Sequence, residues 1–227
     1  LDFFLQTYRP AYAKMTVSGL SLPMMSDGLI YLMERGFTVA CNLAYGISWT
    51  KENLQILERE LDRLVAYYGI HPEKEVCALL EFPYREIYKA SVTKEVYACC
   101  SAGRETVAYD VNGESYPCHM FFSTNHEQTF DASRLSFPVT GIVDKNLLDE
   151  KCRECPIASV CQQCYGSNYL SSGSLYHVAQ EVCDINRITF RMKAKMAANI
   201  WGQKQLALSE EDEYQLLSSI MLVDQME

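Results

Sequence analysis

The sequence lacks long hydrophobic runs and any excess of positive charge. None of its 227 residues lies in a run approaching the roughly 18 apolar residues that predict a transmembrane helix, so we expect no membrane partner. Lys and Arg number 20 against 29 Asp and Glu, and this net charge of −9 argues against a nucleic-acid partner, which requires a basic surface. The first residues also lack the basic and small residues of a secretion signal, so we predict a cytoplasmic protein.

Cysteine is present but unevenly distributed. Eight of the ten cysteines lie between Cys99 and Cys183, whereas the composition as a whole, with 48% hydrophobic and 22% charged residues, is that of an ordinary folded protein. In a reducing compartment, clustered cysteines favour metal binding over disulfide bonds. We therefore expect a regular α/β part followed by a cysteine-rich module.

Short apolar strands alternate with amphipathic helices in the first 90 residues. Strands are predicted at 13–18 and 37–43, and helices are predicted to begin near Ser26 and Asp27 and at Thr50. Gly36 is predicted to end the first helix. This order predicts parallel β/α units. Two such units do not close a sheet, so we expect further strands outside this sequence.

The segment after Cys99 has a different texture, with short strands and turns. The runs 106–111 and 114–118 flank Asn112 and Gly113, a pair that suits the two positive-φ positions of a type I′ turn. We therefore predict a β-hairpin.

Two helices are predicted at the C-terminal end. Apolar residues at helical spacing, Ile185, Ile188, Met192, Met196 and Ile200, predict the first. Ser209 and Asp212 predict a capping box for the second, over 214–223. The expected domains are 1–90, 91–202 and 203–227.

The densest cysteine motif is Cys152-x2-Cys155-x5-Cys161-x2-Cys164. Two-residue spacers turn the backbone so that both sulfurs of a pair face one metal centre. Spacing alone leaves an iron–sulfur site, a zinc site and disulfides open. The two remaining cysteines, Cys41 and Cys77, lie among apolar residues and are predicted to be buried thiols.

Several segments together resemble a known family. They are 100–103, 111–119 with Cys118, 152–156, 161–166 and the late Cys183. In this order they resemble the SPASM domain of radical S-adenosylmethionine (radical SAM) enzymes, over residues 95–200. Within this group the chain resembles peptide-modifying maturases and anaerobic sulfatase-maturating enzymes. One spacing departs from the family pattern, because two residues rather than three separate Cys161 from Cys164.

The resemblance implies two auxiliary [4Fe-4S] clusters. The outer cluster would be held by Cys152, Cys155, Cys161 and Cys183. The inner cluster would be held by Cys100, Cys118 and Cys164. Its fourth ligand is either Cys99 or an external group such as a substrate thiolate, and we favour the external group because adjacent cysteines rarely bind one cluster.

Residues 13–68 resemble the last two units of the family's partial (β/α)6 barrel. This likeness implies that Ser18 and Asn42, at strand ends, contact the nucleoside of S-adenosylmethionine. The radical-generating Cx3Cx2C motif is absent from this sequence. We therefore expect the chain alone to be inactive, and the full-length enzyme to bind S-adenosylmethionine and a third [4Fe-4S] cluster.

The resemblance thus implies the C-terminal half of an oxidoreductase that crosslinks or oxidises a peptide or protein substrate. An electron donor such as a flavodoxin or ferredoxin is the expected partner, and no catalytic residue is predicted. The alternative is a non-enzymatic module, either an iron–sulfur electron carrier or an interaction domain stabilised by zinc.

Overall fold

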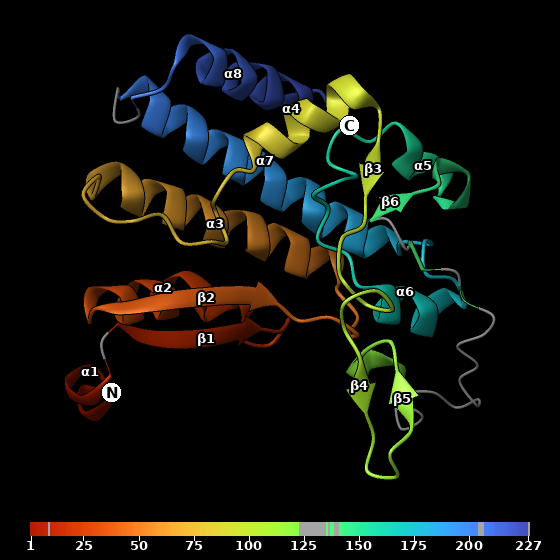
Figure 1. Ribbon diagram of the computed structural model, residues 1–227. Coiled ribbons are helices and arrows are strands. Elements are labelled where there is room, and N and C mark those ends of the chain that lie inside the picture. Colours follow the sequence, from red (N-terminus) through yellow and green to blue (C-terminus); the bar gives the residue numbers. More distant parts are fainter. Residues whose placement is uncertain (9, 123–134, 136, 139–140, 204–206, 227) are drawn as a thin grey trace. The chain divides into compact units, whose positions relative to one another are not determined.

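The protein has a mixed α/β fold that is about half helical, with small two-stranded sheets (Figure 1). The computed structural model describes residues 1–8, 10–122, 135, 137–138, 141–203 and 207–226. These residues form no barrel. No helix in the described ranges is long and apolar enough to cross a membrane.

The chain divides into two compact units. Unit 1 comprises Leu1–Arg85 and Cys183–Glu227, and unit 2 comprises Glu86–Val182. The domain boundaries expected at residues 90 and 202 separate modules of the family that the chain resembles, and they stay a prediction.

Unit 1 contains a parallel strand pair and most of the long helices. Its elements are α1 (Asp2–Thr7), β1 (Ala11–Val17), the 3₁₀ helix η1 (Leu22–Met24), α2 (Met25–Glu34), β2 (Phe37–Leu43), α3 (Lys51–Ile70) and α8 (Glu210–Asp224). Helix α4 (Tyr84–Thr93) begins in this unit, and α7 (Gln180–Gly202) lies in it from Cys183 onward.

Strands β1 and β2 pair in parallel, which confirms the predicted β/α order. Their register runs from Ala11 opposite Phe37 to Val17 opposite Leu43. Alternate β2 residues face the core, together with the apolar side of α3, because successive strand side chains point to opposite faces. The predicted apolar side of α7 is also buried in this core at Ile185, Ile188, Met192 and Met196.

The two helix starts differ in how they are capped. Thr50 caps α3 as predicted, because its Oγ1 accepts the Asn53 N–H at 3.2 Å and the Asn53 Oδ1 accepts the Thr50 N–H at 3.1 Å. The prediction that Ser26 caps α2 is wrong, since η1 leads into this helix and Ser26 is buried in its first turn. Gly36 follows α2 with φ +91°, as predicted.

A carboxylate from α3 replaces the missing local cap of α2. Glu60 is 1% exposed, and its Oε2 accepts both the Ser26 N–H at 3.1 Å and the Ser26 hydroxyl at 2.6 Å. Arg63 Nη1 lies 3.2 Å from Glu60 Oε1. The buried charge is therefore paired and fully hydrogen-bonded, as a buried carboxylate requires.

Unit 2 consists of short elements joined by turns. They are β3 (Val96–Tyr97), β4 (Ala108–Tyr109), β5 (Ser115–Tyr116), η2 (His119–Phe121), β6 (Ile142–Val143), η5 (Lys145–Leu147), α5 (Glu150–Arg153) and α6 (Tyr165–Ser172). Strand β3 pairs with β6, and β4 pairs with β5, both antiparallel.

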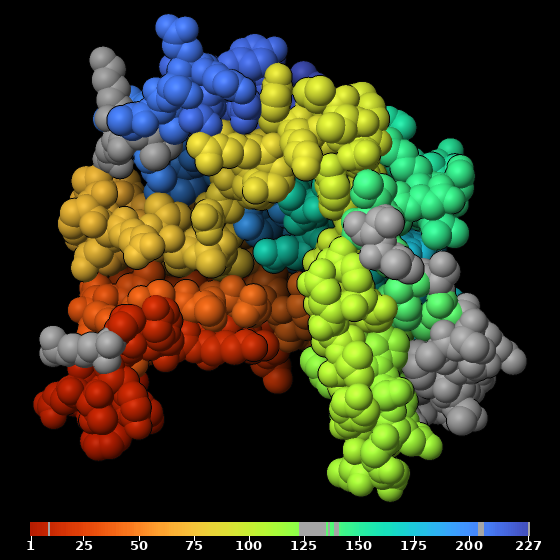
Figure 2. Space-filling view, in the orientation of Figure 1, coloured from red at the N-terminus to blue at the C-terminus, as the bar shows by residue number. Residues whose placement is uncertain are grey.

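The predicted hairpin is present as β4 and β5, and it projects from the rest of unit 2 in yellow-green (Figure 2). Its turn is not type I′, because Gly113 has φ +83° while Asn112 does not have a positive φ. Asp110 Oδ1 instead accepts the N–H groups of Asn112 and Glu114. This Asx-type turn is closed by one left-handed glycine.

We predict that Glu60→Ala lowers the free energy of unfolding by about 2–4 kcal/mol, because the buried Ser26 donors lose their acceptor. Urea unfolding followed by circular dichroism measures the change. Glu58→Ala is the matched control, since Glu58 is an exposed residue on the same helix and should cost less than about 0.5 kcal/mol. Equal losses in the two variants would contradict the assignment.

Candidate metal centre

Three of the predicted inner ligands lie together in unit 2. Cys100 follows β3, Cys118 directly precedes η2, and Cys164 is the N-cap of α6. Their charges act on one another, since Cys100 raises the pKa of both Cys118 and Cys164. The structure thus brings together three thiols that are far apart in the sequence.

Two glycines allow this convergence. Gly103 has φ +71°, and its N–H donates to the Pro117 carbonyl at 3.4 Å, which joins the Cys100 loop to the strand before Cys118. A Cβ at Gly166 would overlap the Met120 side chain, so only glycine lets α6 start so close to η2. Cys118 directly precedes η2 and Cys164 directly precedes α6, so the close approach of these two elements brings the two cysteines together.

Two backbone N–H groups next to each of the three sulfurs act to lower its pKa. The donors are Ala102 and Tyr165 for Cys100, Met120 and Phe121 for Cys118, and Gly166 and Ser167 for Cys164. The Ser167 N–H lies 3.5 Å from the Cys164 sulfur. Such donors stabilise the thiolate, which is the form that binds metals. The donor set therefore fits a thiolate metal site.

The three thiols nevertheless differ in acidity. A hydrogen bond from Cys99, helped by the two backbone donors and the Arg104 charge, lowers the pKa of Cys100 to about 6. Burial raises the pKa of Cys118 and Cys164, although backbone donors oppose it. In the metal-free protein Cys100 is therefore a thiolate at neutral pH.

Cys99 has a different role from its neighbour. Its hydrogen bond to Cys100 is the main reason that its pKa is raised, and burial adds to the effect. The Tyr165 hydroxyl acts in the opposite direction and lowers the pKa of Cys99. Cys99 is thus a neutral thiol placed between a tyrosine and a thiolate. Sequence reasoning missed Tyr165, since no motif distinguishes it among 15 tyrosines.

The predicted outer ligands are only partly collected within unit 2. Cys152 lies on α5, and the Cys155 N–H donates to its carbonyl at 3.3 Å. Cys161 acts electrostatically on Cys99, so it lies towards the inner group. Cys183 belongs to unit 1, on α7, so the four predicted outer ligands do not gather within one unit.

All ten cysteines lie in the described part of the chain, where they are thiols rather than disulfides. Cys41 and Cys77 are buried as predicted, and burial raises the pKa of Cys41 to about 12. Within the described ranges, no three His, Cys, Asp or Glu side chains are already arranged around a single metal ion. Each thiolate of a [4Fe-4S] cluster binds its own iron, so its ligands stand farther apart than those of one ion.

The two predicted nucleoside-binding residues lie at the same end of the parallel strand pair. Asn42 is exposed and opposite Thr16 near the carboxyl end of β2, and Ser18 directly follows β1. The Ser18 N–H donates to the Ser21 hydroxyl at 3.0 Å. In α/β proteins this end of parallel strands is where ligands bind.

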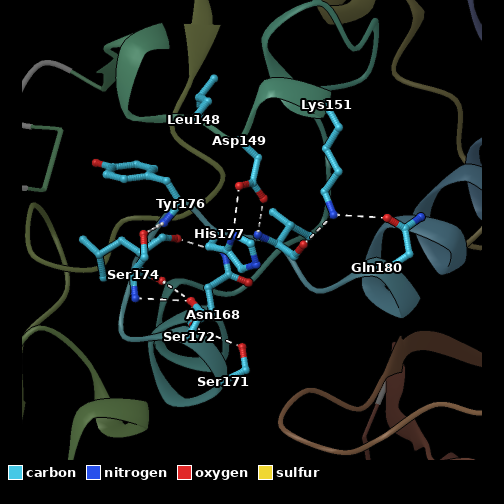
Figure 3. A network of polar contacts seen from close by, with 12 residues as sticks. Leu148, Asp149, Lys151, Asn168, Ser171, Ser172, Ser174, Tyr176, His177 and Gln180 are labelled. Atoms are coloured by element: carbon cyan, nitrogen blue, oxygen red, sulfur yellow. Dashed lines mark hydrogen bonds and ion pairs between the residues drawn. The ribbon is translucent and has the colours of Figure 1, made fainter.

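A polar network anchors the start of α5, which carries Cys152 (Figure 3). Asp149 accepts the Val178 N–H at 2.9 Å, and its other oxygen lies 2.8 Å from His177 Nδ1. Lys151 Nζ donates to the Val178 carbonyl at 2.7 Å. These contacts fasten the segment around Val178 to α5 beside a surface pocket of about 460 Å³. These contacts hold α5, and with it Cys152, in place. They do not by themselves indicate a bound molecule.

The fold and site define a mixed α/β protein with a group of three converging thiols. In comparisons with known proteins, no family model and no curated protein sequence matched the chain. The family resemblance therefore stays a prediction that depends on the cysteine pattern.

We predict that iodoacetamide labels Cys100 of the metal-free protein before Cys118 and Cys164 at pH 7, because alkylation requires the thiolate. Labelling of Cys100 should decline as the pH falls through about 6, where its thiolate is protonated. Peptide mass spectrometry at timed intervals measures both rates. Equal rates at the three cysteines would contradict the predicted difference in acidity.

Proposed function

We propose that this chain is the auxiliary-cluster part of a radical SAM/SPASM enzyme that crosslinks or oxidises a peptide or protein. The observation that carries this proposal is the set of three thiols at SPASM-like spacing, each with two backbone N–H donors. Three cysteines that only filled space in the core would not require such a set of donors.

The ligands follow from this assignment. Cys100, Cys118 and Cys164 hold the inner [4Fe-4S] cluster. Cys152, Cys155, Cys161 and Cys183 hold the outer one. Buried side chains of unit 2, among them Tyr116, Phe121 and Tyr165, form the core against which Cys100 and Cys118 pack, and such apolar surroundings influence the reduction potential of a cluster.

S-adenosylmethionine and a third [4Fe-4S] cluster would supply radical chemistry in the complete enzyme, and the auxiliary clusters would supply one-electron transfer. An electron donor of the flavodoxin or ferredoxin class fits this need. The β1–α2–β2–α3 order corresponds to the last two units of the partial (β/α)6 barrel. Ser18 and Asn42 contact the nucleoside in this proposal, and the parallel strand ends support it.

The fourth position of the inner cluster is taken by an external ligand such as a substrate thiolate. Cys99 is the nearby alternative, but its interaction with Cys100 raises the pKa of Cys99 and favours its neutral thiol. Cys99 would have to lose its S–H proton before it could bind iron. An unfilled position suits an enzyme whose substrate carries a thiol.

We predict that the anaerobically reconstituted chain binds about eight irons with equal sulfide and turns brown, as two [4Fe-4S] clusters require. Cys118→Ala should remove about half of this iron. Cys77→Ala is the control, since Cys77 lies in the core of unit 1 and should leave the iron content unchanged. A colourless protein with stoichiometric zinc would instead support the interaction module.

We also predict that Cys99→Ala retains the iron of both clusters, because Cys99 is not a ligand in this proposal. Iron and sulfide assays of the reconstituted variant measure this. Loss of about half of the iron would identify Cys99 as the fourth inner ligand and refute the external one.

A further inference from the structure

The hairpin of β4 and β5 exposes apolar side chains on one face. Val107 is 60% and Tyr109 is 69% exposed, and Val111 is fully exposed. These three residues alternate with Ala108 and Asp110, which are partly buried, so the three apolar side chains lie on the same face. An apolar face that is open to water often marks an interaction site in a folded protein.

The strand that carries these side chains also has an unpaired backbone edge. Strands β4 and β5 form a sheet of two strands among the described residues, with Tyr109 opposite Ser115. The Asp110 N–H donates to the Glu114 carbonyl at 3.0 Å, so this neighbouring pair is hydrogen-bonded. Hydrogen-bonded and non-hydrogen-bonded pairs alternate in an antiparallel ladder, and the N–H and C=O of Tyr109 therefore point away from β5.

Acidic side chains lie on the other face of the hairpin. Asp110 follows Tyr109 and so points to the opposite face, and Glu114 lies directly across from Asp110. The Tyr116 hydroxyl donates to Glu114 Oε2 at 3.0 Å. Within the described part of the chain, neither carboxylate forms an ion pair. Their negative charge therefore favours a partner that carries positive charge.

We propose that the free edge of β4 binds an extended segment of the peptide or protein substrate in which apolar and basic residues alternate. This inference rests on the proposed function, which supplies such a substrate. The segment adds to the hairpin as a third strand, and its backbone forms hydrogen bonds with Tyr109.

The two faces of the hairpin define the side chains of the bound segment. Successive residues of a strand point to opposite faces, so every second side chain of the segment lies beside Val107, Tyr109 and Val111. The side chains between them point to the face of Asp110 and Glu114. Apolar residues fit the first position and lysine or arginine fits the second.

A second copy of the chain fits this edge less well than a basic peptide. Pairing of two hairpins would place Asp110 and Glu114 of one copy near the same carboxylates of the other, and like charges on adjacent strands are destabilising. Each chain also carries a net charge of −9. Charge therefore favours the basic peptide over a dimer.

The experiment measures binding of a fluorescently labelled synthetic peptide to the full chain by fluorescence anisotropy. The probe alternates valine and lysine over about six residues, the length of a typical strand. One comparison peptide alternates valine and glutamate, and another has the composition of the probe with its valines and lysines in separate blocks. Both should bind at least about tenfold more weakly, because several cross-strand pairs are lost together.

Tyr109→Pro tests the backbone edge. Proline lacks an N–H, and because the Tyr109 N–H points away from β5, this substitution leaves the pairing of β4 with β5 intact. The variant should lose binding of the probe. Tyr109→Val is the matched control, since it keeps the N–H and an apolar side chain and should bind the probe nearly as well as the wild type.

Glu114→Lys tests the charged face. It should weaken binding of the lysine probe and strengthen binding of the glutamate peptide, a reversal that a folding defect does not produce. Val92→Ser is the control for general loss of exposed apolar surface, because Val92 is exposed on α4 in the same unit and should leave both affinities unchanged.

The possible failures are distinguishable, because peptide binding is measured on the metal-free chain and iron on the reconstituted chain. If the chain binds both clusters but the three peptides bind equally, or Tyr109→Pro binds the probe as the wild type does, this inference is overturned and the proposed function stands. If the chain binds no iron, the proposed function fails, whereas loss of probe binding in Tyr109→Pro still supports a peptide site at β4.

Two further outcomes also decide. Should Tyr109→Pro fail to fold, an unchanged peptide preference in Glu114→Lys overturns the inference. Self-association of the wild-type chain without probe binding would identify a second copy as the occupant of the edge and would overturn it as well.

Discussion

A thiolate that is partly removed from water needs hydrogen-bond donors, and the local structure around the half-buried Cys100, Cys118 and Cys164 supplies them from the backbone. A turn with a left-handed glycine, a 3₁₀ helix and the first turn of α6 each present N–H groups to one sulfur. Such groups are fixed in place by the fold, so they stabilise negative charge without the entropy cost of ordering a long cationic side chain. The short elements of unit 2 thus serve to bring N–H groups to sulfur.

The features predicted correctly from the sequence are those determined by local patterns. Strand β2 has the predicted bounds because its apolar residues alternate, and α3 has the predicted cap at Thr50 because its capping box lies within four residues. The cap of α2 was missed because its acceptor, Glu60, lies 34 residues from Ser26. The type I′ turn was predicted wrongly because the Asp110 side chain accepts the Asn112 N–H and so stabilises a different backbone conformation.

The candidate site likewise has features that the sequence predicts and features that it does not. The resemblance to the SPASM domain implies that Cys100, Cys118 and Cys164 form one group, and in the structure Cys100 is near enough to raise the pKa of both of the others. Spacing carries no information about the burial of Tyr165, whose ring packs against Phe137 and Tyr176. The distinction between adjacent Cys99 and Cys100 likewise depends on which groups fold against each sulfur.

Cys164 performs two tasks with one atom. Its sulfur caps α6 by accepting the Ser167 N–H, and it is also one of the three converging thiols. A group that binds the Cys164 sulfur therefore also changes the stability of the first turn of α6. Binding at the sulfur and formation of the helix are thermodynamically linked in this way. The hydrogen-exchange rates of the N–H groups in the first turn of α6 therefore depend on what is bound to Cys164, the N-cap of this helix.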